Sequence, residues 1–220
     1  MKNFENKNVI ITGGTAGIGF ATTQAFLNEG AQVWITGRSL ETLQKIKNEI
    51  NNDKLNIIVS DTSNLAGINL LDNEIKKQNI KIDVLFLNAG IATFKSIALS
   101  TEEDFDSQFN TNVKGAFFTL QKLIPFLNEG ASVIINGSTN ATASALGSSI
   151  YAATKAAIIK IAQVAANELA ELKVRVNVVS PGPTLTRGLE GAVSTEALDY
   201  LASKTAVQRL AEPIEIANAV

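Results

Sequence analysis

Short apolar segments alternate along this chain with longer amphipathic ones, and this alternation constrains the fold more than any other feature. The short segments are nearly continuous in Val, Ile, Leu, Phe or Trp, as strands buried on both faces of a sheet are. They predict six strands, at Asn8–Thr12, Gln32–Thr36, Asn56–Ser60, Asp83–Leu87, Ser132–Asn136 and Arg175–Val179. The amphipathic segments predict helices at Ile18–Glu29, Leu40–Ile50, Leu65–Gln78, Glu102–Leu127 and Tyr151–Leu172. Such alternation implies right-handed βαβ crossovers and a three-layer α/β fold, in which helices cover both faces of a doubly wound parallel sheet.

Local signals mark several helix boundaries. The sequence Ser-Thr-Glu-Glu at Ser100–Glu103 predicts a capping box that opens the fourth helix. The hexapeptide Phe-Leu-Asn-Glu-Gly-Ala occurs at Phe26–Ala31 and again at Phe126–Ala131. In both copies we expect it to end a helix, with Gly30 or Gly130 as a left-handed cap residue, and to lead into the next strand.

The composition excludes several kinds of chemistry. The 220 residues include no His and no Cys, so an imidazole base, a Ser-His-Asp triad, a disulfide and the usual zinc ligands are all unavailable. We assign no metal site, and proton transfer near neutral pH must use a carboxylate, Lys or Tyr with a shifted pKa. The net charge of −2, without long runs of one sign, argues against nucleic-acid and membrane partners.

The expected organisation is simple. No Pro- or Gly-rich linker divides the chain, so residues 1–220 are predicted to form a single domain. The sequence begins without a recognisable signal peptide and contains no apolar stretch of about 18 residues, which is the length that a membrane span needs. We therefore expect a soluble, cytoplasmic protein.

A glycine-rich loop, Thr-Gly-Gly-Thr-Ala-Gly-Ile-Gly, joins the first predicted strand to the first helix. At such a junction glycine allows a tight turn and lets the backbone approach a pyrophosphate, while the helix N-terminus supplies amide donors. A βα turn that merely requires glycine would show a similar pattern. The position after the first buried strand favours dinucleotide binding in a Rossmann-type fold. The candidate cofactor-binding residues of this loop are Gly13, Thr15, Gly17, Ile18 and Gly19.

The end of the second predicted strand indicates which dinucleotide binds. In Rossmann-type folds an acidic residue at this place bonds the adenosine 2′-hydroxyl, whereas an Arg accommodates a 2′-phosphate. Here the segment Trp34–Ser39 has no Asp or Glu and contains Arg38. NADP(H) is therefore preferred over NAD(H), the alternative being that Arg38 is an ordinary solvated loop cation.

Tyr151 and Lys155 lie four residues apart at the start of the fifth predicted helix, so their side chains face the same way. An ammonium near a phenol favours the phenolate and lowers a pKa of about 10 by roughly one to three units. Such a Tyr could act as an acid or a base in a chain without His. Taken alone, this pair is more typical of a solvated helix surface.

Together with the glycine loop, the pair makes this chain resemble the short-chain dehydrogenase/reductase family, from Asn8 to the last residue. The family's motifs are matched in order, and Ser138 precedes Tyr151 by the family's usual 13 residues. The matched positions are Gly13, Gly17, Gly19, Asp61, Asn88-Ala89-Gly90, Asn112, Ser138, Tyr151, Lys155, Pro181-Gly182, Thr184 and Thr186.

The resemblance implies hydride transfer between a nicotinamide and a carbonyl carbon. Tyr151 would protonate the carbonyl oxygen in reduction or deprotonate the alcohol in oxidation, and Lys155 would lower the pKa of Tyr151 and bind the nicotinamide ribose. Ser138 would hold the substrate oxygen, and Asn112 would hold a water of the proton relay. In isolation, Ser138 would be an ordinary loop residue and Asn112 a residue of a helix kink.

The resemblance also assigns residues to the cofactor. Asp61 would bind the adenine, Asn88-Ala89-Gly90 would shape the cofactor site, and Pro181-Gly182 would lie beside the nicotinamide. Thr184 belongs to the same turn, and Thr186 would bond the carboxamide. The family usually continues for a few dozen residues beyond the helix predicted at Glu212–Ala217, adding a last strand, so we expect the sequence ending at Val220 to be truncated.

Assembly and substrate are less defined by the sequence. The predicted helix Tyr151–Leu172 carries more Ala than one buried face requires, which suggests a homodimer or homotetramer, although Ala is also simply a good helix former. The expected substrate segments, Leu185–Ala206 and Ala141–Leu146, are mostly small and apolar, which suggests a small, largely uncharged carbonyl or alcohol. Ile124–Ser132 lacks the basic residues that would dock a carrier-protein thioester.

Two other functions compete with an oxidoreductase. A catalytically silent dinucleotide-binding sensor or scaffold would be expected to lose Tyr151 or Lys155, and both are present. A methyltransferase of related architecture would need neither this pair nor Arg38.

Overall fold

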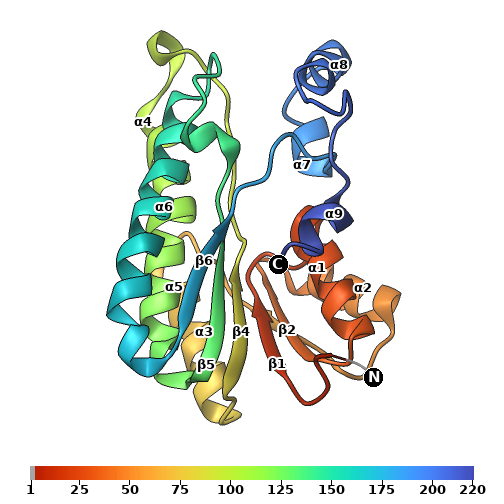
Figure 1. The fold of residues 1–220 in the computed structure, drawn as a ribbon, viewed down its shortest axis with the longest axis vertical. Coiled ribbons are helices and arrows are strands. Elements are labelled where there is room, and N and C mark those ends of the chain that lie inside the picture. Colours follow the sequence, from red (N-terminus) through yellow and green to blue (C-terminus); the bar gives the residue numbers. More distant parts are fainter. Residues whose placement is uncertain (1–2) are drawn as a thin grey trace.

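The computed structural model describes residues 3–220, which are built around one parallel sheet (Figure 1). The strand order is β3-β2-β1-β4-β5-β6. The strands are β1 (Asn8–Ile11), β2 (Gln32–Gly37), β3 (Leu55–Val59), β4 (Ile82–Leu87), β5 (Leu127–Asn136) and β6 (Arg175–Val179). This is the order of a Rossmann-type fold, and it confirms the predicted α/β class with a doubly wound parallel sheet.

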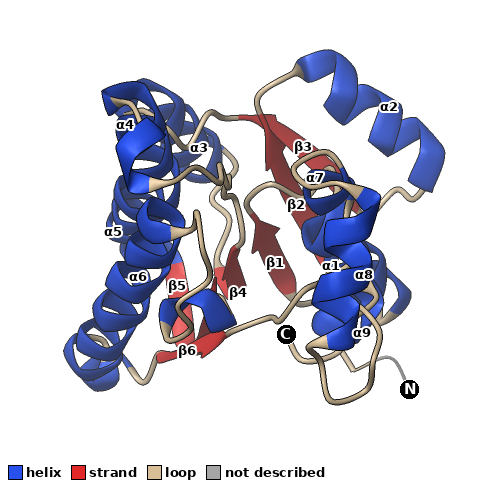
Figure 2. Ribbon diagram, turned by 90° about the horizontal axis from the view of Figure 1, so that it is seen from above, coloured by secondary structure: helices blue, strands red, loops and turns tan. Residues whose placement is uncertain are grey.

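Helices cover both faces of the sheet (Figures 1 and 2). One face carries α1 (Gly17–Asn28), α2 (Leu40–Ile50) and α9 (Pro213–Ala217), and the other carries α3 (Leu65–Lys77), α5 (Ala116–Leu123) and α6 (Ser149–Glu168). The remaining helices are α4 (Glu102–Gln108), α7 (Arg187–Glu190) and α8 (Thr195–Ser203). The three-layer arrangement is therefore as predicted, and none of the described helices is long and apolar enough to cross a membrane.

Each strand contributes to two separate hydrophobic cores, because successive side chains of a strand point to opposite faces. In β1, Val9 and Ile11 pack on the side of α1 and α2, whereas Ile10 packs on the side of α3, α5 and α6. In β2, Val33 and Ile35 pack on the side of α1 and α2, whereas the Trp34 ring between them packs on the side of α3, α5 and α6. Burial on both faces is the reason that these strands read as continuous apolar runs in the sequence.

The prediction of one continuous helix at Glu102–Leu127 is wrong. The α4 helix ends at Gln108 and is followed by a π-helical segment, Phe109–Gly115, before α5 begins. A π turn accommodates one extra residue, and here it contains Asn112, whose buried side chain bonds the backbone of Ile91 instead of facing solvent. The α5 helix ends at Leu123 because Pro125 has no amide hydrogen with which to continue it.

The repeated hexapeptide behaves differently in its two copies. Gly30 and Gly130 both adopt the expected left-handed backbone, with φ of 90° and 79°. The first copy ends α1, as predicted. The second does not end an α-helix: its first residue closes a short 3₁₀ turn, Ile124–Phe126, and its remainder lies in β5. The difference follows from Pro125, which precedes only the second copy.

The capping box of α4 lies one residue later than predicted. The Oγ1 atom of Thr101 accepts a hydrogen bond from the Asp104 amide at 3.1 Å, and the Asp104 carboxylate accepts one from the Thr101 amide at 3.0 Å. Ser100 instead donates its hydroxyl to the carbonyl of Ser96. Asp104 is preferred as the partner because its carboxylate also pairs with the Lys95 ammonium.

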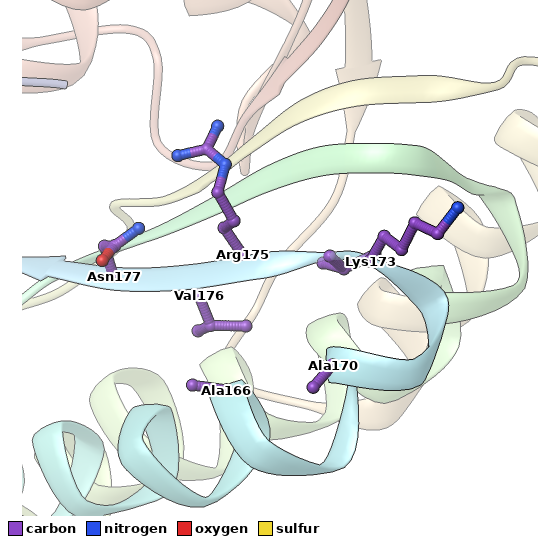
Figure 3. A pocket seen from close by; sticks show the side chains of 7 residues that line it. Ala166, Ala170, Lys173, Arg175, Val176 and Asn177 are labelled. Atoms are coloured by element: carbon purple, nitrogen blue, oxygen red, sulfur yellow. The ribbon is translucent and has the colours of Figure 1, made fainter.

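A cavity of about 530 Å³ opens along β6, which pairs only with β5 within residues 3–220 (Figure 3). Val176 points toward Ala166 of α6, whereas Arg175 and Asn177 point to the opposite side of the strand. The lining holds no cluster of groups able to transfer a proton, and it contains none of the predicted site residues. We therefore assign no chemistry to this cavity.

Neighbouring leucines of α3 provide a test of the core. Leu71 is 0% exposed and Leu70 is 55% exposed on the same helix, so Leu→Ala changes helix propensity equally at both positions. We expect Leu71→Ala to lower the free energy of unfolding by about 2–5 kcal/mol, as buried leucines do, and Leu70→Ala to lower it by less than about 1 kcal/mol. Urea denaturation measures both, and equal losses would contradict the assigned orientation of α3.

Candidate active site

The candidate site lies at the carboxyl ends of β1, β4, β5 and β6. The sheet order reverses between β1 and β4, and in open α/β sheets ligands bind in the crevice outside such a switch point. Because parallel strands all end at the same edge, the loops that follow β1, β4 and β5 meet there. Those loops begin at Thr12, Asn88 and Gly137.

The glycine loop has a backbone that only glycine fits. Gly13 and Gly17 have φ of 66° and 52°, and a Cβ atom on Gly19 would lie 2.2 Å from the Gly13 carbonyl oxygen. Ala16 precedes α1 without capping it, and the first turn of α1 holds no acidic side chain. The amides at the start of α1 are therefore available to an anion, and the helix dipole favours one there.

Most of the other helices in the described chain have a side-chain cap at their N-terminus. The capping residues are Ser39 for α2, Asn64 for α3, Thr101 for α4, Thr186 for α7 and Ser194 for α8. An uncapped α1 behind a glycine loop thus fits the pyrophosphate of a dinucleotide. Thr15 and Ile18 belong to this unit, since Thr15 lies against Gly37 at the end of β2 and Ile18 packs on the core under α1.

Asn88 fastens the loop after β4 to the glycine loop. Its Nδ2 atom donates to the carbonyl oxygens of Thr12 and Gly13 at 3.0 and 3.1 Å. The amides of Asn88 and Ala89 both donate to Thr12 Oγ1, at 3.0 and 3.1 Å. The segment Asn88-Ala89-Gly90 is therefore held rigidly beside the candidate cofactor loop.

Ser138 and Tyr151 meet at the end of β5. Ser138 is buried, and its Oγ atom accepts a hydrogen bond from the Asn140 amide at 3.1 Å. Tyr151 lies in the first turn of α6, where burial raises the pKa of its phenol and a hydrogen bond with the Ser138 hydroxyl offsets part of that rise. Phe94 packs edge-on against the Tyr151 ring, with 5.7 Å between the ring centroids.

Lys155 is buried below Tyr151 on the same helix. Its side chain is only 5% exposed, and its Nζ atom donates to the Asn136 carbonyl oxygen at 2.7 Å. The same Nζ lies 5.7 Å from the centroid of the Tyr151 ring. Burial lowers the pKa of Lys155 to about 8, so the ammonium persists at neutral pH.

The expected lowering of the Tyr151 pKa by Lys155 is wrong for this structure. Tyr151 and Lys155 do lie on one side of α6, but the pKa of the phenol is raised, because desolvation of the phenolate is the dominant effect. Lys155 does not outweigh this effect, and its Nζ is directed to the Asn136 carbonyl. The sequence spacing gave the common side of the helix but could not give the depth of burial.

Asn112 joins the loop after β4 to α6. Its Oδ1 accepts from the Ile91 amide at 2.8 Å, and its Nδ2 donates to the Ile91 carbonyl at 2.9 Å and to Thr154 Oγ1 at 3.0 Å. A Cβ atom on Gly90 would lie 3.2 Å from Asn112 Oδ1 and 3.7 Å from Lys155 Nζ. The structure thus brings Asn112, Gly90 and Lys155 together.

The predicted residues after β6 reach the glycine loop. Thr186 caps α7 by accepting from the Leu189 amide at 3.2 Å, and its Cγ2 lies 3.1 Å from the position of a Cβ on Gly17. Thr184 Oγ1 donates to the Gly182 carbonyl at 3.0 Å. The Pro181 carbonyl accepts from the Thr139 amide at 3.0 Å, which joins this turn to the loop after β5.

Arg38 and Asp61 lie apart from the Ser138–Tyr151–Lys155 cluster, at the ends of the outer strands. Arg38 is exposed and directly follows β2. Asp61 follows β3, and its Oδ1 accepts from the Ser63 amide at 3.0 Å. The cluster and the two outer residues therefore lie on opposite sides of the glycine loop.

Asn136 is a site residue that the sequence analysis did not single out. Its carbonyl accepts from Lys155, and its Nδ2 donates to Asn88 Oδ1 at 2.9 Å, so it joins the ammonium to the loops of β4 and β1. Its own Oδ1 is buried and has no partner within residues 3–220. A polar residue ending an otherwise apolar strand, two positions before Ser138, was the signal in the sequence.

The sheet, the glycine loop and the uncapped α1 define a nucleotide-binding class of α/β protein. Comparison with known proteins gives the family. The sequence profile described as short chain dehydrogenase matches residues 7–197. The chain belongs to the short-chain dehydrogenase/reductase family of oxidoreductases.

Individual relatives agree with this assignment. Oxidoreductase asL5 of Sarocladium schorii is 31% identical over 218 residues, which are 98% of this chain and 87% of the relative. A short chain dehydrogenase from Burkholderia cenocepacia, solved with NADP, superposes with a TM-score of 0.90 at 30% identity, over 98% of this chain and 89% of that one. A 3-ketoacyl-(acyl-carrier-protein) reductase from Brucella melitensis, solved with NADH, gives 0.88 at 27% identity over the same shares.

The titration of Tyr151 can be measured directly, because Tyr200 is the only other tyrosine. In a Tyr200→Phe background, phenolate absorbance reports Tyr151 alone. We expect it to titrate above the ordinary value of about 10, because burial raises its pKa. Adding Ser138→Ala should raise the pKa further, because the hydrogen bond that lowers it is lost. A midpoint below the ordinary value would instead support control by Lys155.

Proposed function

We propose that this chain reduces a carbonyl group, or oxidises the corresponding alcohol, with NADP(H) as its redox partner. The substrate is small and largely uncharged, and Tyr151 is the general acid/base. The observation that carries this proposal is the cluster of buried Ser138 and Lys155 with partly buried Tyr151 at the carboxyl edge of the sheet, beside a glycine loop and an uncapped helix.

The residues present fit a nicotinamide dinucleotide. A side chain at Gly19 would collide with the Gly13 carbonyl oxygen. Because glycine is present there, the loop packs closely on α1 and a pyrophosphate can approach the start of that helix. The cofactor-binding residues are Gly13, Thr15, Gly17, Ile18, Gly19, Arg38, Asp61, Asn88, Ala89, Gly90, Tyr151, Lys155, Pro181, Gly182, Thr184 and Thr186. When bound, the dinucleotide supplies the redox chemistry, and the chain supplies binding, orientation and proton transfer.

Tyr151 acts as the proton donor in reduction. A raised pKa keeps its phenol protonated at neutral pH, as a general acid must be. The proton moves from Tyr151 Oη to the substrate oxygen, which Ser138 holds through its hydroxyl. Positioned proton transfer of this kind contributes ~10²–10⁴ in rate.

Lys155 stabilises the phenolate that remains after proton transfer. Its pKa of about 8 keeps the ammonium charged at neutral pH, and its Nζ is close to the Tyr151 ring. The same ammonium binds the nicotinamide ribose. Asn112 positions the helix that carries both residues and provides the site for the relay water, through the loop carbonyls that it orders.

Arg38 favours NADP(H) over NAD(H). Solved relatives hold NADP in one case and NADH in another, so the preference is argued from this chain's own residues. Arg38 stands directly after β2, and the segment from Trp34 to Ser39 contains no carboxylate to bond a free 2′-hydroxyl. An exposed guanidinium at this place can pair with a 2′-phosphate.

The chain is further proposed to act as a homodimer or homotetramer in the cytoplasm. α5 and α6 are neighbours on one face of the molecule, and each presents an exposed apolar side chain, Phe117 and Val164 respectively. The Ala-rich surface of α6 allows close approach of another helix. A second copy of this chain is the proposed partner.

Replacement of the two central residues tests the mechanism. We expect Tyr151→Phe to lower kcat for NADPH-dependent ketone reduction by at least ~10²-fold, because the proton donor is lost. NADPH affinity should fall by no more than about tenfold, the loss of a single hydrogen bond. Lys155→Met should lower kcat as well, whereas Lys160→Met, at an exposed position of the same helix, should not.

The outcomes separate the alternatives. Undiminished turnover in Tyr151→Phe contradicts the assigned acid. NADPH binding without turnover of ketones, aldehydes, sugars or acyl thioesters by the wild type would favour the dinucleotide-binding sensor.

Replacement of Arg38 tests the cofactor preference. Loss of an ion pair with a 2′-phosphate should weaken NADPH binding by about 10–100-fold in Arg38→Ala, as for other charge-assisted hydrogen bonds. NADH binding should change by less than about twofold. Arg175→Ala, at the amino end of β6, is the matched control. An unchanged ratio of the two affinities in Arg38→Ala would refute the phosphate role.

A further inference from the structure

Phe94 packs against the ring of the proposed acid, Tyr151. Its ring meets the Tyr151 ring edge-on, with 5.7 Å between centroids and 67° between planes, which is a favourable aromatic geometry. A carbonyl that accepts a proton from the Tyr151 hydroxyl must bring its substituents past the groups that flank this phenol. Phe94 is therefore placed to touch the substrate rather than only the protein core.

The position of Phe94 is fixed on both sides along the chain. Before it, the Thr93 amide and carbonyl both bond the side chain of Gln108, which is fully buried, at 3.2 and 3.4 Å. After it, the Lys95 amide donates to the Gly147 carbonyl at 2.9 Å. Phe94 is thus held at a defined distance from Tyr151 by contacts independent of any substrate.

Charge is neutralised around this ring. Lys95 is the only charged residue from Ile91 to Ser100, and its Nζ contacts both Asp104 carboxylate oxygens at 2.7 and 2.8 Å. The segment from Thr139 to Ser148 contains no charged residue at all. A charged substituent brought against these two segments would find no unpaired opposite charge on them to compensate its desolvation.

The segment that is hydrogen-bonded to the Phe94 segment carries an exposed apolar side chain. Leu146 is 101% exposed, and it directly precedes Gly147, whose carbonyl is bonded to Lys95. An exposed leucine on this segment offers surface that an apolar ligand group could cover. Phe94 and Leu146 thus stand on the two bonded segments that lead to Tyr151.

We propose that Phe94 is a specificity-determining residue, forming with Leu146 an apolar wall that limits the size of the group on one side of the substrate carbonyl. The substrate class is a ketone or aldehyde whose substituents are uncharged and compact on the side of Phe94. That the ligand is a carbonyl compound rests on the proposed reductase function. The apolar wall itself rests on the contact between the Phe94 and Tyr151 rings.

Substitution of Phe94 tests the wall. Phe94→Leu is compared with Phe105→Leu, because Phe105 of α4 stacks on Phe109 and is not one of the proposed site residues. The readout is the ratio of kcat/KM for acetophenone to that for butan-2-one, which differ in a phenyl or ethyl group on the carbonyl. We expect Phe94→Leu to raise this ratio at least tenfold, by opening space for the phenyl group, and Phe105→Leu to leave it unchanged.

Binding of non-reducible carbonyl probes separates this inference from the proposed function. The ratio of dissociation constants for benzamide and propanamide, measured by calorimetry with the NADPH-loaded protein, should fall at least tenfold in Phe94→Leu. If wild type turns over no ketone but this binding ratio shifts, the wall is supported and the reductase function fails. If ketones are reduced and neither ratio shifts, the wall is overturned and the function stands.

Two further arms complete the test. Phe94→Trp should shift both ratios in the opposite direction, which guards against a general loss of folding in Phe94→Leu. Pyruvate should be reduced at least tenfold less efficiently than butan-2-one by wild type, because its carboxylate finds no free cation at this wall. Efficient reduction of pyruvate, or the absence of both turnover and amide binding, would overturn the proposed substrate class.

Discussion

Burial of one ammonium group organises the candidate site. Lys155 of α6 is buried, and its Nζ donates to the Asn136 carbonyl. The lowering of its pKa from 10.5 to about 8 corresponds to a free-energy cost of about 3 kcal/mol for keeping the buried side chain charged. The chain tolerates that cost because α6 and β5 are fixed by the apolar core on their inner faces. A cation whose position is set by a strand and a helix cannot drift, and this rigidity gives Tyr151 a defined neighbour.

From this ammonium a continuous series of hydrogen bonds runs across three strand ends. Asn136 connects Lys155 to Asn88, and Asn88 in turn holds the carbonyls of Thr12 and Gly13. The series exists because β1, β4 and β5 are adjacent in the sheet although they are far apart in the sequence. The glycine loop and the proton-transfer groups are therefore parts of one rigid unit.

The sequence predicted the strands and most helices well, because the central residues of strands buried on both faces are nearly all apolar. It failed where one residue redirects the chain, as Pro125 does after α5. In the site, side chains with a chemical function could be predicted. The polar side chain of Asn136 was visible in the sequence, but its contact with Lys155 was not, because the group that it offers Lys155 is a backbone carbonyl. The direction of the Tyr151 pKa also depends on depth of burial, which no spacing encodes.

The π-helical segment Phe109–Gly115 has a consequence for how this helix can vary. Successive residues of an α-helix are turned by about 100° around the axis. Removing one residue from the segment would restore a regular helix, but it would also rotate everything on one side of the deletion by that angle relative to the other. Either Asn112 would leave Ile91 and Thr154, or Leu120 and Leu123 would leave the core. The extra residue thus rotates the two ends of the helix relative to each other. This rotation lets Asn112 bond Ile91 and Thr154 while Leu120 and Leu123 stay in the core.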